Sequence, residues 1–166
     1  RCVERHLKMN LPVDAGALLL IEVDGQTEEV GVIIEKLRTL CMSQGAKDTK
    51  VAGKKEEIAE LWKARKAISP ALFQYGPDKI NEDIVVPRSK IPDMVKKIEV
   101  LKEKTGLTMV SFGHAGDGNL HPQILYDGYN PNEVKRVESA VADLFQNPQD
   151  LKDDVLGRCP PPEVTL

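Results

Sequence analysis

Two histidines near the middle of the chain give its sharpest chemical signal. They are His114 and His121, within the segment FGHAGDGNLH at residues 112–121. The dipeptide Asp117-Gly118 favours a two-residue hairpin turn, and counting outward from that turn places the histidines directly opposite each other. Opposed residues of a hairpin point to the same side, with Cβ atoms roughly 4.5–5.5 Å apart. Two imidazoles placed in this way can bind one divalent metal ion.

Two histidines do not complete a metal site, because a third protein ligand, often a carboxylate, is normal. The spacing therefore fits a hydrogen-bonded histidine pair in a structural hairpin equally well, and both interpretations stay open. Asn119 is expected on the same face of the hairpin, where it could contact a polar ligand. The glycines of the segment do not predict a phosphate loop, since a strand rather than a helix N-terminus should follow them.

An arginine on an apolar helix stripe is the second signal. The segment ELWKARKAIS at residues 60–69 predicts a helix face that includes Arg65 and, one turn later, Ser69. A guanidinium on a buried stripe is costly unless it is paired, and its planar fork fits a carboxylate. A substrate carboxylate and a neighbouring glutamate would both satisfy it. Lys79 is a further candidate for substrate binding, although a solvated loop lysine explains it as well.

The elements that must position these residues follow from the hydrophobic periodicity. Helices are expected at residues 27–44, 55–69 and 90–105, and a fourth is expected with Asn130 as its cap and Pro131 as its first residue. Strands are expected at residues 17–23, 49–52, 81–86, 107–115 and 119–126. Because the last two strands form a hairpin, the pattern predicts an α+β fold with a mainly antiparallel sheet and helices on one face.

Length, charge and cysteine usage limit the class of protein. The 166 residues fit one domain, expected over residues 1–146, followed by an irregular tail over residues 147–166. A net charge of −3 gives no basic field for nucleic acid, and the longest apolar run is too short to span a bilayer. The three cysteines form no CxxC pair, which favours a reducing compartment over a disulfide framework or a zinc ribbon: Cys2, Cys41 and Cys159.

Taken together, these residues resemble a known family. The segments LWKARKAISPALFQYGPDKINEDIVVPRSKIPDMV (61–95) and SFGHAGDGNLHPQIL (111–125) are similar to the C-terminal domain of FAD-linked oxidases. This family includes D-lactate dehydrogenase, D-2-hydroxyglutarate dehydrogenase and the glycolate oxidase flavin subunit. The GHxGDGNxH motif is its most specific part, and the WxxR and EDIxVP segments support it. The resemblance implies a ferredoxin-like domain that caps a flavin bound by a separate FAD domain.

The resemblance also implies roles for individual residues. His114 and His121 would bind a divalent metal, such as Zn, Mn or Fe, and His121 is the candidate for a catalytic role. The positions that match the family's substrate contacts are Arg65, Ser69, Asn119 and, more loosely, Lys79. The implied reaction is the oxidation of a D-2-hydroxy acid to a 2-oxo acid with FAD as the cofactor.

The chain departs from the family pattern in two ways. The FAD domain expected upstream is not among the 166 residues, and neither is the family's GEHG segment, which supplies a glutamate ligand and the usual candidate base. Neither Glu163 nor the acids at residues 150–154 lie in that context, so none of them takes the glutamate's place. We therefore expect a fragment of such an enzyme, inactive alone, with an FAD domain of the same or another chain as its partner.

Two other classes of function remain open. The chain could be a non-catalytic module that binds a metal or carboxylate, or that pairs with a flavin subunit, or a structural domain without a site. The expected location is the cytoplasm or the mitochondrial matrix, with peripheral membrane attachment of the complete enzyme as an alternative. An open sheet edge could also pair two copies into a homodimer. The sequence leaves the particular 2-hydroxy acid and the electron acceptor open.

Overall fold

The computed structural model describes residues 1–145 and forms two compact units. The first unit is Arg1–Ala71, and the second begins at Leu72. The tail expected at residues 147–166, which includes Cys159, lies outside the described residues. Within residues 1–145, no helix combines the length and the apolar character that crossing a bilayer requires.

The first unit contains helices only. They are α1 (Cys2–Leu7), α2 (Thr27–Ser43), α3 (Lys55–Lys66) and α4 (Ile68–Ala71). A small core forms where Val3 of α1 packs with Ala67 and Ala71. The helices predicted at residues 27–44 and 55–69 are thus confirmed, with the second one divided at Ala67.

The strands predicted at residues 17–23 and 49–52 are wrong. Residues 17–23 have an irregular backbone, and the side chains of Leu18 and Leu19 are 70% and 67% exposed. A strand needs a neighbour to bind its N–H and C=O groups, and the first unit provides none. Helix α2 has no buried residue either. The apolar periodicity of residues 27–44 predicts a helix, but it does not determine which part of the protein covers the apolar face of that helix.

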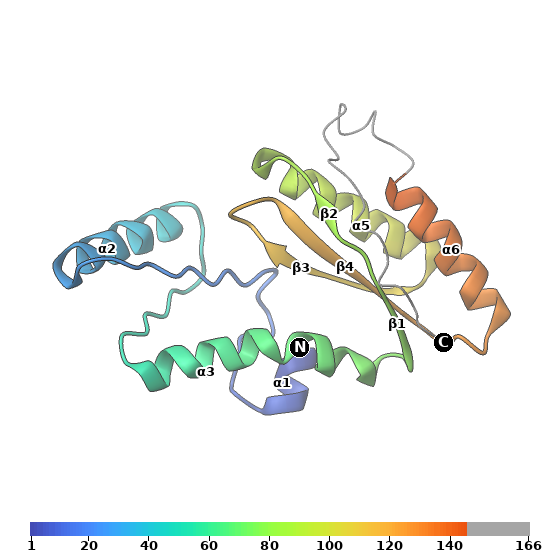
Figure 1. Ribbon diagram of the computed structural model, residues 1–166, viewed down its shortest axis with the longest axis horizontal. Coiled ribbons are helices and arrows are strands. Elements are labelled where there is room, and N and C mark those ends of the chain that lie inside the picture. Colours follow the sequence, from blue (N-terminus) through green and yellow to red (C-terminus); the bar gives the residue numbers. More distant parts are fainter. Residues whose placement is uncertain (146–166) are drawn as a thin grey trace. The chain divides into compact units, whose positions relative to one another are not determined.

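The second unit is built on an antiparallel sheet (Figure 1). Its strands are β1 (Asp78–Asn81), β2 (Ile84–Val85), β3 (Thr108–His114) and β4 (Asn119–Tyr126). Strand β4 is central, with β3 on one side and both β1 and β2 on the other. The remaining elements are two short 3₁₀ helices and two longer α-helices: η1 (Leu72–Gln74), η2 (Arg88–Lys90), α5 (Ile91–Thr105) and α6 (Pro131–Phe145).

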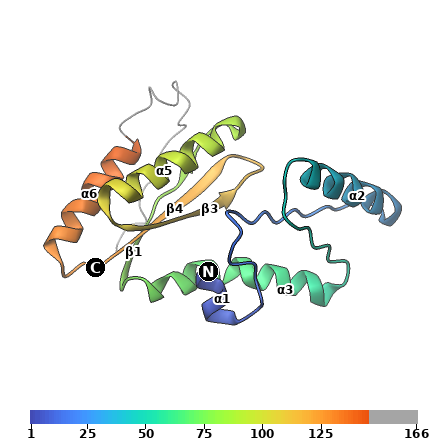
Figure 2. The same cartoon turned by 180° about the vertical axis from the view of Figure 1, so that it is seen from behind.

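Helices α5 and α6 lie side by side over one face of this sheet, as the view from behind also shows (Figure 2). The core between them is made of alternate strand residues and the inward residues of each helix. Its buried members include Ile84, Leu120, Ile124, Met94, Ile98, Val137 and Leu144. The prediction of an α+β fold with an antiparallel sheet and helices on one face is therefore confirmed.

A proline interrupts the strand at the edge of the sheet. The sequence predicts one strand over residues 81–86, but the structure has β1 and β2 separated by two residues. Both strands pair with β4 in one register, which places Glu82 opposite Pro122. The N–H of Glu82 donates to the carbonyl of Pro122 at 3.1 Å, but proline has no N–H to donate in return. The hydrogen-bond ladder between β4 and the edge strand therefore lacks one bond at Pro122, and the edge strand is divided into β1 and β2.

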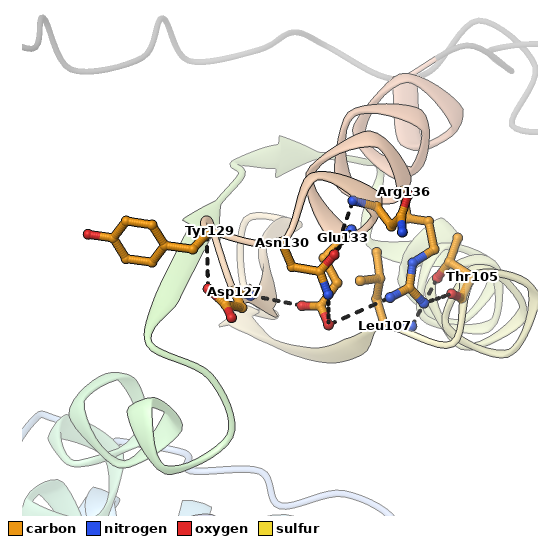
Figure 3. Close-up of polar contacts among 8 residues, drawn as sticks. Thr105, Leu107, Asp127, Tyr129, Asn130, Glu133 and Arg136 are labelled. Atoms are coloured by element: carbon orange, nitrogen blue, oxygen red, sulfur yellow. Dashed lines mark hydrogen bonds and ion pairs between the residues drawn. The ribbon is translucent and has the colours of Figure 1, made fainter.

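The start of α6 follows the predicted capping pattern (Figure 3). The Oδ1 of Asn130 accepts hydrogen bonds from the backbone N–H groups of Asn132 and Glu133, at 3.1 and 3.4 Å. The carboxylate of Glu133 in turn accepts the N–H of Asp127 at 2.8 Å. Arg136, one turn further along, donates to the carbonyl of Thr105 at 2.9 Å and so ties α6 to the end of α5. The predicted cap at Asn130 is confirmed.

We expect Asn130→Ala to lower the free energy of unfolding by about 1 kcal/mol, because two N–H groups at the start of α6 lose their acceptor. Urea unfolding followed by circular dichroism measures the change. Asn132→Ala is the matched control and should change the free energy by less than about 0.5 kcal/mol, since its side chain is exposed. Equal effects of the two substitutions would contradict the capping role.

Candidate functional site

The hairpin of β3 and β4 holds both histidines, in a register that differs from the predicted one. His114 pairs with Asn119, and Phe112 pairs with His121. The predicted two-residue turn is therefore wrong: a four-residue loop, 115–118, joins the strands, and the N–H of Gly118 donates to the carbonyl of His114 at 3.0 Å. The register shift is two residues, which is one full period of a strand. Both histidines consequently keep the shared face that the sequence predicts, opposite the face covered by α5 and α6.

The two imidazoles are in contact across the hairpin. Their ring centroids lie 5.3 Å apart, and the ring planes are nearly perpendicular, at 89°. His114 is exposed, whereas the side chain of His121 is only 17% exposed. The ring of Phe112 lies beside His121 with a centroid separation of 5.8 Å. His121 is thus the fixed member of the pair, and His114 is the accessible one.

Asp83 is a site residue that the sequence reasoning missed. Its Oδ1 makes a short contact with the Nδ1 of His121. The register that places Glu82 opposite Pro122 also places Asp83 opposite His121, so the two side chains share a face. The signal was the period of two in the NEDIVV segment, which places Asp83 on the face opposite the buried Ile84 and Val86. The sequence did not show that this segment pairs with β4.

Two buried oxygens on the same face have no hydrogen-bond partner within residues 1–145: Oδ1 of Asn119 and Oε1 of Gln123. Gln123 is only 1% exposed, and its Nε2 donates to Oδ1 of Asn81 across the sheet. Buried acceptors are normally satisfied, so these two oxygens are suited to a ligand hydroxyl or a water molecule. Gln123 was not predicted, although its position two residues after His121 places it on the histidine face.

Lys79 lies on this face too, further along the sheet. It pairs with Leu125, which is four residues beyond His121 on β4, or roughly 13 Å at the usual rise of a strand. Its Nζ lies 5.0 Å from the centroid of the Phe73 ring, a cation–π contact. Lys79 therefore belongs to the face of the histidines without touching them.

Arg65 and Ser69 belong to the first unit. Arg65 lies in the last turn of α3 and Ser69 in α4, and both are half-buried. They flank Ala67, a member of the small core of that unit. The predicted spacing of one helical turn between them is confirmed, because Ala67 continues the helical hydrogen bonds from α3 into α4. Their role toward a carboxylate remains a prediction.

The residues that the structure describes do not assemble a complete metal site by themselves. No three His, Cys, Asp or Glu side chains within residues 1–145 lie close enough to share an ion. The histidine pair therefore offers two nitrogen donors at most, while Asp83 is engaged at the other nitrogen of His121.

The comparisons with known proteins agree on one family. The sequence matches the family of FAD linked oxidases, C-terminal domain, over residues 1–151. It is 40% identical over 155 residues to glycolate oxidase subunit GlcD of Bacillus subtilis (strain 168), covering 93% of this chain and 33% of that relative. It is 33% identical over 125 residues to D-lactate dehydrogenase of Anaerostipes hadrus, covering 74% and 26%. It is also 33% identical over 109 residues to D-2-hydroxyglutarate dehydrogenase of Stutzerimonas stutzeri (strain A1501), covering 64% and 23%. The chain thus spans a third or less of the length of these curated relatives.

We expect Gly118→Ala to lower the free energy of unfolding by about 2 kcal/mol or more, because its φ of +80° strains an L side chain and a Cβ would lie 1.8 Å from the carbonyl oxygen of Val86. Thermal unfolding measures this effect. Gly116→Ala in the same loop is the matched control, since a Cβ there meets no atom within 4 Å and should change stability little. Equal stability of the two variants would contradict the described loop.

Proposed function

The chain belongs to the family of FAD linked oxidases, C-terminal domain, and we propose that it forms the substrate-side part of an FAD-dependent dehydrogenase that oxidises a D-2-hydroxy acid to a 2-oxo acid. The names of its relatives support this proposal, because glycolate, D-lactate and D-2-hydroxyglutarate are all 2-hydroxy carboxylates. The structural observation that carries the proposal is the contact between His114 and His121 on one polar sheet face.

In this proposal His114 and His121 hold a divalent metal ion, such as Zn, Mn or Fe. A histidine that binds a metal usually donates its other ring N–H to a carboxylate, and Asp83 takes that position at His121. The imidazole centroids, 5.3 Å apart, allow both rings to reach one ion at metal–nitrogen distances of about 2.0–2.1 Å. The donor set fits a metal as two of its ligands, and further ligands would come from outside the described residues.

The other proposed residues bind and orient the substrate. When bound, a metal would polarise the substrate hydroxyl and FAD would accept a hydride. The Arg65 guanidinium is proposed to bind the substrate carboxylate, with the Ser69 hydroxyl as a second donor. The Oδ1 of Asn119, which has no partner among residues 1–145, would accept a hydrogen bond from a hydroxyl group, and Lys79 would bind a further anionic group.

The contact with Asp83 argues against His121 as the base that takes the substrate proton. Its Nδ1 is engaged, and its Nε2 is assigned to the metal, so His121 has no nitrogen left to take the substrate proton. We therefore place His121 beside the reacting hydroxyl as a ligand and assign the base to another group.

The exposed apolar side chains of the first unit favour a second function, docking on a flavin-carrying partner. Leu18 and Leu19 are the most exposed of them. Apolar surface of this kind often marks an interaction site. Co-expression with an FAD domain of a relative would test it: a yellow complex that co-purifies supports docking, and separate elution of the two proteins contradicts it.

We expect the purified chain to contain a divalent metal in near-stoichiometric amount and His114→Ala to contain little, because one of the two nitrogen donors is lost. Elemental analysis of the two proteins gives the result. His6→Ala is the control and should retain the metal, since His6 lies in α1 of the first unit. Equal metal content in wild type and His114→Ala would contradict the site.

We expect Arg65→Met to weaken the binding of glycolate roughly ten- to hundredfold, which corresponds to the loss of one charge-assisted interaction of about 1.5–3 kcal/mol. Chemical-shift titration measures the affinity. Arg38→Met removes an exposed arginine that pairs with Glu35 and should leave the affinity unchanged. A variant at Arg65 that loses thermal stability but not affinity would support the alternative of an internal salt bridge.

A further inference from the structure

We propose that Asp83 is a positioning residue, which holds the imidazole of His121 with its proton on Nδ1 and its lone pair on Nε2. This inference rests on the proposed function in one respect, namely that a metal ion uses this lone pair. The state of the ring itself is a property of residues 83 and 121 and can be measured without any metal.

The chemistry of a carboxylate gives this contact the direction of its hydrogen bond. An ionised carboxylate can only accept, so the Oδ1 of Asp83 requires a proton on the Nδ1 of His121. A neutral imidazole carries one ring proton, and Nε2 is then an acceptor or a metal ligand. Asp83 thus selects which of the two nitrogens is presented to a ligand.

The surroundings of the ring show that this contact is built into the sheet. Asp83 and His121 are cross-strand partners by register, and their side chains are 32% and 17% exposed. The rings of Phe112 and His114 lie against His121 at centroid distances of 5.8 and 5.3 Å. Asp117, the acid of the loop 115–118, accepts the backbone N–H of Asn119 at 3.0 Å. Asp83 is therefore the carboxylate that orients His121.

Loss of Asp83 should change which ring nitrogen of His121 carries the proton. An imidazole in water prefers its proton on Nε2, and that state offers an N–H where a metal needs a lone pair. Removal of a carboxylate that orients a histidine ligand typically weakens metal binding by about 10–100-fold. We expect a loss in this range for Asp83→Ala.

The first test observes the ring directly, by long-range ¹H–¹⁵N correlation spectra of the metal-free, full-length chain. The chain has only three histidines, so His6→Ala and His114→Ala assign the signals. We expect His121 of the wild type to carry its proton on Nδ1, and Asp83→Ala to move it largely to Nε2. A wild-type proton on Nε2, protons on both nitrogens, or an unchanged spectrum in Asp83→Ala would each overturn the proposal.

The second test measures Zn²⁺ affinity by titration. Asp83→Ala should bind Zn²⁺ about 10–100-fold more weakly than wild type and Asp83→Asn less severely, because the amide keeps size and one acceptor. Glu99→Ala, which removes an exposed carboxylate paired with Lys102, is the charge control and should bind as wild type. Equal affinity of Asp83→Ala and wild type would overturn the positioning role.

The two tests separate the inference from the proposed function. If the wild type binds no Zn²⁺, the metal part of the proposed function fails, while the spectra still decide the state of His121. If Asp83→Ala does not fold, the wild-type spectrum and Asp83→Asn decide the proposal. In that case, a proton on Nε2 in the wild type, or wild-type Zn²⁺ affinity in Asp83→Asn, would overturn it.

Discussion

The antiparallel hydrogen bonding of β4 is the constraint on which the second unit depends. Within residues 72–145, every other strand pairs with β4. Because side chains alternate along a strand, one set of its residues packs against α5 and α6, as Leu120 and Ile124 do. The alternate set, which includes His121 and Gln123, lies on the opposite face. The apolar core and the candidate site are therefore two faces of one strand, and the packing that fixes one also positions the other.

Features that depend on neighbouring residues could be predicted from the sequence. The bounds of β4, 119–126, are as predicted, and the cap at Asn130 follows from residues within four positions of it. The hairpin turn was predicted at the correct place with the wrong length, since Asp117-Gly118 also fits a four-residue loop with Gly118 at positive φ. The shared face of the histidines was still correct, because the error was one full strand period.

Features that depend on a distant partner could not be predicted in this way. The apolar run at residues 17–23 has the composition of a strand, but composition does not supply a neighbouring strand, and the run is irregular and exposed. The contact between Asp83 and His121 joins residues 38 positions apart, and only the register of β2 with β4 reveals it. The division of the edge strand likewise required knowing that Pro122 lies beside it.

Because β1 and β2 pair with β4 in one register, the number of residues between these two strands determines which side chain faces His121. The segment between Asn81 and Ile84 is bound by the ladders on both sides of it, so its residues cannot slide along β4. One inserted or deleted residue there would exchange the two faces of the sheet locally and turn an acid other than Asp83, or none, toward His121. The number of residues between the two strands therefore matters to the site as much as the carboxylate of Asp83 itself does.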